Sequence, residues 1–204
     1  MAEALQLFLD QIDTPIGELM IVADAGGRLR TIHWVGEAAR PHARRGWTRT
    51  HSGRGSSGAL VQGDDREYVR RLLGKHYDVE VALEPASNPG GLTSAMSAYF
   101  GGDLAAIDML PVETSGTPFQ RSVWRALRDI PCGTTISYAE LARRIGRPSA
   151  VRAVGLANGS NPVGIVVPCH RVIGSNGTLT GYGGGIERKR WLLAHERATP
   201  TLFG

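Results

Sequence analysis

The chain has 204 residues, of which 42% are hydrophobic, and a formal net charge of +4 at pH 7. This length is sufficient to bury a core in one domain or in two small ones. No apolar run approaches the roughly 20 residues that a membrane helix needs, and two cysteines exclude both a disulfide framework and a four-cysteine zinc site. Because no signal-peptide pattern opens the chain, we expect a soluble protein of the reducing cytoplasm.

The charge is divided unevenly along the chain. Residues 116–204 contain 12 Arg and Lys against 4 Asp and Glu, a net charge of +8, whereas residues 1–115 contain 11 against 15, a net charge of −4. Phosphate neutralisation supplies most of the non-specific affinity for nucleic acid, so a polyanion is a candidate partner of the second half. A well-solvated basic surface would give the same asymmetry, and charge alone does not decide between the two.

The first 35 residues predict a small antiparallel sheet. Residues 5–12 and 18–23 are apolar segments on either side of a Pro- and Gly-containing turn, which is typical of a hairpin. Residues 29–35 alternate in character after a Gly-Gly turn and predict a third strand. His33 lies in that strand without a second His or Cys at a metal-binding spacing, and residues 1–115 contain no cysteine. We therefore expect no metal site here.

A change in composition follows the sheet. Residues 38–65 are rich in Arg, Gly and Ser and too poor in apolar residues to form a core. We expect a mobile, solvated insertion, with DNA contact by its arginines as the alternative. Residues 67–76 and 92–100 carry apolar side chains at helical spacing and predict two helices. Residues 104–113 are expected to be extended and to close an N-terminal α/β domain of residues 1–113.

The second domain, residues 114–204, opens with helix signals. Thr117 is a suitable N-cap and Pro118 a suitable first helical residue. Further along, Ser137 and Ser149 are placed to cap two short helices separated by a Gly-Arg-Pro turn. Two short helices joined in this way indicate a helix-turn-helix.

The second of these helices consists largely of small residues, among them Ala153 and Gly155. Glycine inside a helix costs about 1 kcal/mol relative to alanine, so its presence indicates a close approach to another surface. That surface is either the rest of the protein, which is the more frequent case, or a partner.

The segment around Cys169 is the strongest functional signal. Residues 165–167 form an apolar run that predicts a short buried strand ending at Pro168, which has no N–H to donate. His170 and Arg171 adjoin the thiol, and we expect this electropositive setting to lower the pKa of Cys169 and favour a nucleophile. The alternative is a buried structural cysteine. Since adjacent residues of a strand point to opposite faces, the thiol and the imidazole cooperate only if the chain turns at Pro168.

Five short motifs follow one another along residues 116–204. They are Ser137-Tyr138-Ala139-Glu140-Leu141-Ala142, Arg152-Ala153-Val154-Gly155, Asn161-Pro162 with Pro168-Cys169-His170-Arg171-Val172, Gly181-Tyr182-Gly183-Gly184-Gly185, and Leu192-Leu193-Ala194-His195-Glu196. In this order and without gaps, they resemble the O6-alkylguanine-DNA alkyltransferases, a family of DNA repair proteins. The likeness over residues 1–115 is much thinner.

The resemblance implies direct-reversal repair. The thiolate of Cys169 would attack the alkyl (methyl) group on O6 of a flipped-out guanine and keep it as S-alkylcysteine, irreversibly, once per molecule and without a cofactor. His170 and Glu196 would relay the proton through water, and Asn161 would fix the turn that carries the cysteine. Tyr138 would press on the 3′ phosphate and donate a proton towards N3 of guanine.

The resemblance also assigns DNA and pocket contacts. The second helix would enter the minor groove, with Arg152 filling the space of the flipped nucleotide and Ala153 and Gly155 permitting the close fit. Several members carry Ser where this chain has Gly183, so a hydrogen bond to O6 is absent here and a roomier pocket could admit larger alkyl groups. The residues that the resemblance places at the alkyl pocket are Val172, Tyr182 and Gly183.

We therefore expect an α+β protein, with a small N-terminal antiparallel-sheet domain carrying a helix and a mostly helical C-terminal domain carrying the helix-turn-helix and Cys169. Its expected partner is double-stranded DNA containing O6-alkylguanine, bound by a monomer or by several molecules cooperatively, and no metal, cofactor or membrane is expected.

Three other functions stay open as alternatives. A lesion-binding protein without transfer would be expected to lack the cysteine. A helix-turn-helix regulator would need major-groove side chains that the small second helix does not offer. A cysteine hydrolase would need an oxyanion hole that the sequence does not show.

Overall fold

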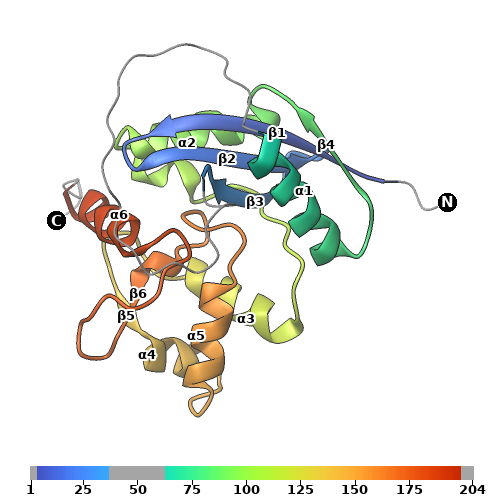
Figure 1. Ribbon diagram of the computed structural model, residues 1–204. Helices are drawn as coiled ribbons and strands as arrows, with labels where there is room; N and C mark the ends of the chain where they lie inside the picture. The colour runs from blue at the N-terminus through green and yellow to red at the C-terminus, as the bar shows by residue number, and fades with distance from the viewer. Residues whose placement is uncertain (1–3, 37–62, 199–204) are drawn as a thin grey trace.

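The computed structural model describes residues 4–36 and 63–198 (Figure 1). Most of the insertion predicted at residues 38–65 lies outside these ranges. Its C-terminal boundary was wrong, because α1 (Gly63–Tyr77) already begins at Gly63. None of the helices in the described ranges is long and apolar enough to cross a membrane.

A four-stranded sheet, in the order β3-β2-β1-β4, forms the upper part of the molecule in Figure 1. The predicted hairpin and third strand are present as β1 (Leu5–Thr14), β2 (Gly17–Asp24) and β3 (Leu29–Trp34), which pair antiparallel. The sheet also contains one strand that was not predicted. A fourth strand, β4 (Val81–Pro85), pairs parallel to β1, and α1 provides the crossover that a parallel pair requires.

Successive residues of a strand point to opposite sides of the sheet. In this sheet, side chains on both sides are buried. Met20 and Val22 of β2 join the cluster under α1, whereas Leu19 and Ile21 join the main core on the other face. A strand buried on both faces reads as a continuous apolar run. For this reason β2 was recognisable as a strand although it does not alternate.

The helix α2 (Leu92–Phe100), preceded by η1 (Pro89–Gly91), packs on the main-core face and buries Leu92, Met96 and Tyr99. The prediction of an extended segment after it was wrong for residues 104–107. These form a 3₁₀ turn, η2 (Leu104–Ile107), which buries Ile107.

The second half contains helices and two short strands. The predicted N-caps at Thr117 and Ser137 are confirmed, since their hydroxyls accept from the backbone N–H of Gln120 and Glu140. The N-cap predicted at Ser149 was wrong. The helix α5 begins at Val151, and its N-cap residue, Ala150, makes no side-chain capping hydrogen bond. The elements are α3 (Pro118–Arg128), β5 (Ile136–Ser137), α4 (Tyr138–Arg144), α5 (Val151–Gly159), η3 (Cys169–Arg171), β6 (Val172–Ile173) and α6 (Ile186–Ala198).

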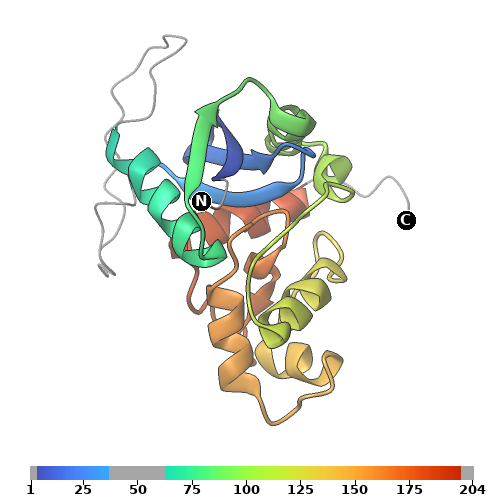
Figure 2. The ribbon, with the colours of Figure 1, turned by 90° about the vertical axis from the view of Figure 1, so that its right-hand side faces the viewer.

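The position of the cysteine follows from how these parts pack. In both views α4 and α5 lie at the end of the molecule that is farthest from the sheet, while α6 lies just below the sheet (Figures 1 and 2). The main core contains side chains from both halves of the chain, including Leu19, Tyr99, Val123, Val154 and Leu192. Cys169 belongs to that shared core.

Candidate active site

The segment before the cysteine is a turn rather than the predicted strand. Ile165 has a φ of 74°, which is left-handed and rare for a β-branched residue. The side chain of Asn161 holds the two ends of the turn together: its Nδ2 donates to the carbonyl of Val167 at 2.7 Å, and its Oδ1 accepts from the N–H of Val163 at 3.1 Å. The apolar run is therefore buried but curled, and burial alone produced the strand-like pattern.

Cys169 opens the 3₁₀ turn η3 and is only 6% exposed. The prediction of a lowered thiol pKa was wrong. Burial raises the pKa of Cys169, against the smaller opposing effects of a hydrogen bond from Asn161 and the charge of Lys189. The flanking cation Arg171 does not compensate, because it is turned towards Glu196. The thiol is therefore protonated at rest, and a nearby base must remove its proton before it can act as a nucleophile.

A buried network connects η3 to the last helix. His170 Nε2 lies 2.8 Å from Oε1 of Glu196. Arg171 donates from Nη2 to the same oxygen at 2.8 Å and from Nε to Oε2 at 2.9 Å, and its Nη1 donates to the carbonyl of Ile130 at 2.6 Å. Arg171 is only 4% exposed, and its guanidinium is held by Glu196 inside the protein.

The charges of this network are fixed by burial and pairing. Burial would raise the pKa of Glu196, but hydrogen bonds and charges from His170 and Arg171 hold it well below its ordinary value. Because Arg171 is permanently charged, Glu196 stays ionised whether or not the imidazole is protonated. Burial lowers the pKa of His170 in spite of Glu196. A neutral imidazole that donates from Nε2 to a carboxylate leaves Nδ1 as a proton acceptor.

Lys189 is a member of the site that the sequence reasoning missed. Its side chain is fully buried, and Nζ donates to the carbonyls of Val172 at 2.7 Å and Thr180 at 2.9 Å. It thus ties the chain after the cysteine to the start of the glycine-rich loop, and burial lowers its pKa to about 8. Lys189 stands in a charged run that reads as a solvated helix face. The available signal was its position three residues before Leu192 and seven before Glu196, on one face of α6.

The glycine-rich loop forms another wall beside the turn. A Cβ built at Gly164 would lie 3.7 Å from the hydroxyl of Tyr182, which places this ring against the cysteine turn. At Gly183 a Cβ would have no neighbour within 4 Å among the described residues, whereas at Gly184 it would lie 2.7 Å from Nε1 of Trp34. Val172 is fully buried. A side chain would therefore have room at residue 183, whereas at residue 184 it would collide with Trp34.

The helix-turn-helix exposes small residues. On α5, Arg152 and Ala153 are exposed, and a Cβ at Gly155 would lie 3.9 Å from the ring of Tyr138. Tyr138 itself is half-buried at the start of α4, and its hydroxyl donates to the carbonyl of Thr180 at 3.5 Å. The two helices and the glycine-rich loop therefore meet at Tyr138.

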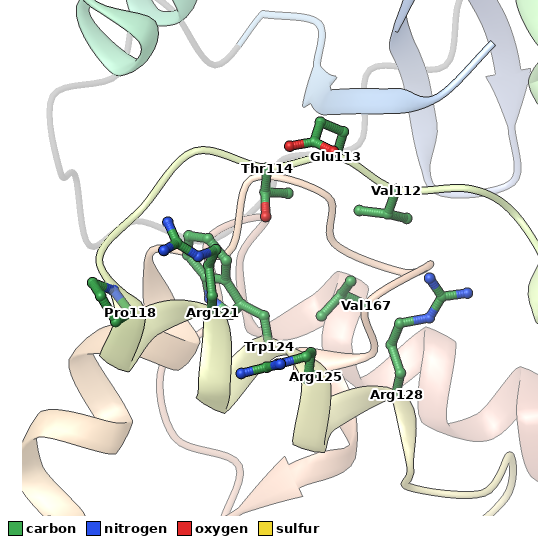
Figure 3. Close-up of a pocket in the computed structure, with 9 residues that line it drawn as sticks. All are labelled: Val112, Glu113, Thr114, Pro118, Arg121, Trp124, Arg125, Arg128 and Val167. Atoms are coloured by element: carbon green, nitrogen blue, oxygen red, sulfur yellow. The ribbon is translucent and has the colours of Figure 1, made fainter. Parts of the chain in front are cut away.

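A cavity of about 450 Å³ lies beside α3 and is not lined by the thiol. Figure 3 shows residues 112–114 facing α3 across it, with Val167 at its back. Arg121 and Arg128 donate to backbone carbonyls of residues 116, 108 and 110, so these arginines fasten the preceding chain to α3. We assign no chemistry to this cavity. Within residues 4–36 and 63–198, no group of three or more His, Cys, Asp or Glu side chains is placed to hold a metal ion.

A buried cysteine next to a His–Glu pair, beside a helix-turn-helix, indicates a class of DNA-binding protein with a reactive thiol. Residues 118–198 match the family model described as the DNA-binding domain of 6-O-methylguanine DNA methyltransferase. The methylated-DNA--protein-cysteine methyltransferase of Salmonella typhimurium is 48% identical over 193 residues, which cover 94% of this chain and 96% of that protein. The corresponding protein of Mycobacterium tuberculosis is 55% identical over 123 residues, covering 57% of this chain and 74% of that protein.

Solved structures give the same result. The crystal structure of Mycobacterium tuberculosis O6-methylguanine methyltransferase matches with a TM-score of 0.67 and 35% identity, covering 96% of both chains. The structure of Mycobacterium tuberculosis OGT in complex with DNA matches with a TM-score of 0.65, 35% identity and coverage of 97% and 96%. The chain therefore belongs to the methylated-DNA--protein-cysteine methyltransferase family, whose members repair DNA by direct reversal, moving an alkyl group to a cysteine of the protein.

Proposed function

We propose that this chain repairs O6-alkylguanine in double-stranded DNA by transferring the alkyl group to Sγ of Cys169. Membership of the family supplies the reaction class. The observation that supports the assignment to this residue is the buried thiol next to His170 in the chain, whose Nε2 lies 2.8 Å from Oε1 of Glu196. Burial lowers the pKa of His170, and its partners lower that of Glu196, which favours a neutral imidazole beside an ionised carboxylate.

In the proposed mechanism the proton of the thiol moves first. We propose that a water carries it from Sγ to Nδ1 of His170, a buried nitrogen with no partner among the described residues, and that Glu196 stabilises the imidazolium that forms. The thiolate then attacks the alkyl carbon, so that an S–C bond forms and the C–O6 bond breaks with its electron pair passing to guanine. The guanine takes up a proton, for which the hydroxyl of Tyr138 is the proposed donor. A thioether does not hydrolyse under these conditions, so each molecule reacts once.

The DNA-binding part of the proposal uses the exposed side of α5. The O6 atom of a stacked guanine cannot reach a buried thiol, so the nucleotide must flip out, which costs a few kcal/mol and least for a poorly paired lesion. Arg152 would fill the space that the base leaves, while Ala153 and Gly155 allow the helix to approach the minor groove. Tyr138, between this helix and the loop, would press on the 3′ phosphate.

The proposed alkyl pocket is bounded by Val172, Tyr182 and the open position at Gly183. Because nothing described lies within 4 Å of a Cβ at residue 183, we propose that the pocket accepts alkyl groups larger than methyl. We further propose that the protein acts as a monomer in the cytoplasm, where its thiol stays reduced. The division into domains of residues 1–113 and 114–204 stays a prediction.

Stoichiometry tests the proposed function. With a duplex carrying one O6-methylguanine in tenfold molar excess, we expect repair to stop when one lesion per protein molecule has been removed. The measurement is the amount of restored guanine by chromatography at successive times. Continued repair beyond one equivalent would show that the alkyl group leaves the protein, and no repair with tight binding would indicate a lesion-binding protein.

Replacing Arg152 with alanine should slow repair more than it weakens binding to undamaged DNA. The lost side chain would no longer occupy the gap in the duplex, so the flipped state would lose about 1–3 kcal/mol, which makes transfer roughly 5- to 150-fold slower. The measurement is the single-turnover rate on duplex substrate. Arg147→Ala, in the turn between the helices, is the matched loss of one charge. Equal effects of the two substitutions on the rate would contradict a role of Arg152 in flipping.

A further inference from the structure

Tyr99 brings the N-terminal half of the chain into contact with the proton-transfer network. It lies in α2, is fully buried, and its hydroxyl donates to Oε1 of Glu196 at 3.0 Å. The same oxygen is 2.8 Å from Nε2 of His170 and from Nη2 of Arg171. The donor from α2 therefore shares one carboxylate oxygen with the imidazole of the proposed base.

We propose that Tyr99 is a positioning residue for proton transfer: its hydroxyl fixes the Glu196 carboxylate against His170 and takes up part of the negative charge that would otherwise act on the imidazole. The proposal rests on the proposed function, in which His170 receives the thiol proton.

Contacts to the backbone and to the ring of Tyr99 fix the direction of its hydroxyl. His195 Nε2 lies 2.8 Å from the carbonyl of Tyr99, and the ring meets those of His195 and Phe100 edge-on, at centroid distances of 5.2 and 5.4 Å. A buried phenol needs one acceptor, and a backbone carbonyl would satisfy it equally well. Here the acceptor is an ionised side chain in contact with the proposed base.

The N-terminal sheet also contacts the cysteine turn and the glycine-rich loop. The hydroxyl of Thr31 and the N–H of Ile32 both donate to the carbonyl of Pro162, each at 2.9 Å, at the start of the cysteine turn. Trp34 lies against Gly184 of the glycine-rich loop. These contacts fix backbone only. Tyr99 is the contact from this half that reaches the ionisable groups of the described site.

The effect on the imidazole has a definite sign. A hydrogen bond to the charged form of a carboxylate stabilises that form and weakens the carboxylate as a proton acceptor. Without the Tyr99 hydroxyl, Glu196 attracts the imidazolium form of His170 more strongly, and the pKa of His170 rises. The charged or titratable groups that face Glu196 are Tyr99, His170, Arg171 and Cys132, and His170 also faces Lys189.

The test is Tyr99→Phe, which removes one oxygen and keeps the ring. Transfer requires neutral His170, so the single-turnover rate rises with pH through the pKa of this residue. We expect the midpoint of that rise to move upward by about 0.5 pH unit or more in Tyr99→Phe, with roughly threefold slower transfer below the midpoint. Tyr77→Phe is the matched control, because its hydroxyl donates to the carbonyl of Glu113 at 3.3 Å, outside the site. Its midpoint should equal that of the wild type.

A second substitution reverses the sign. Fluorotyrosine at position 99 is a more acidic phenol and a better donor, so it should move the midpoint downward while keeping the hydroxyl in place. Histidine-labelled NMR of the protein without DNA gives the pKa of His170 independently of repair, and should show the same order. Identical midpoints in all variants would show that Tyr99 is only a core residue and would overturn the proposal. A wild type that takes up no alkyl group would overturn the proposed function, but the NMR would still test the effect of Tyr99 on the pKa of His170.

Discussion

Cys169→Ser should transfer no measurable alkyl group, a decrease of more than about 10,000-fold in the single-turnover rate. The hydroxyl of serine is far less acidic than a thiol, so the neutral imidazole of His170 cannot generate its conjugate base in useful amounts. Binding to the lesion should persist, because the substitution replaces one buried atom. The measurement is transfer of a labelled methyl group from duplex DNA to protein.

Cys132→Ser is the control for this experiment. Cys132 is the other cysteine of the chain, half-buried in a turn, and burial raises its pKa to about 11. This variant should still take up one alkyl group per molecule. If Cys169→Ser took up the label and Cys132→Ser did not, the reacting thiol would be that of Cys132, and the mechanism would be overturned.

Glu196→Gln should lower the free energy of unfolding by about 3–5 kcal/mol, because it leaves the buried guanidinium of Arg171 without its counter-charge. Urea titration of wild type and variant measures the difference. Glu187→Gln is the matched control on the same helix: Glu187 is 61% exposed and pairs with Arg190 at the surface. Its removal should cost less than about 1 kcal/mol. Equal costs would contradict the buried network.

The pH dependence of that difference has a defined direction. In the folded protein the pKa of Glu196 is held below its ordinary value of 4.5, so its contribution is fully present above that value. It is lost as the pH falls towards the lowered pKa of the folded state. The stability difference between wild type and Glu196→Gln should therefore shrink as the pH falls from about 5 to about 3. A difference that grows on acidification would contradict this assignment.

Local signals predicted much of the fold. Strands β1 to β3 were visible as apolar segments between turns, and the caps at Thr117 and Ser137 were visible because capping depends on neighbouring residues. The strand expected at residues 165–167 failed for a general reason. An apolar run reports burial, and it cannot show that the Asn161 side chain holds the backbone in a turn.

The candidate site was predictable only in part. The motifs named His170 and Glu196, and the structure brings these two side chains together. The lowered pKa expected for Cys169 failed because the sequence shows adjacent cations but not their partners or the extent of burial. Tyr99 was missed because its partner lies 97 residues away in the chain, and a tyrosine at helical spacing among apolar residues is indistinguishable from ordinary core.

The most direct test of the account is the mass of the intact protein after mixing with a duplex that carries one O6-methylguanine, followed by peptide mapping. The account predicts a gain of one methylene, about 14 Da, confined to the peptide that contains Cys169 and absent from Cys169→Ser. An unmodified protein that binds the lesion tightly, or a gain of mass on any other peptide, would contradict it.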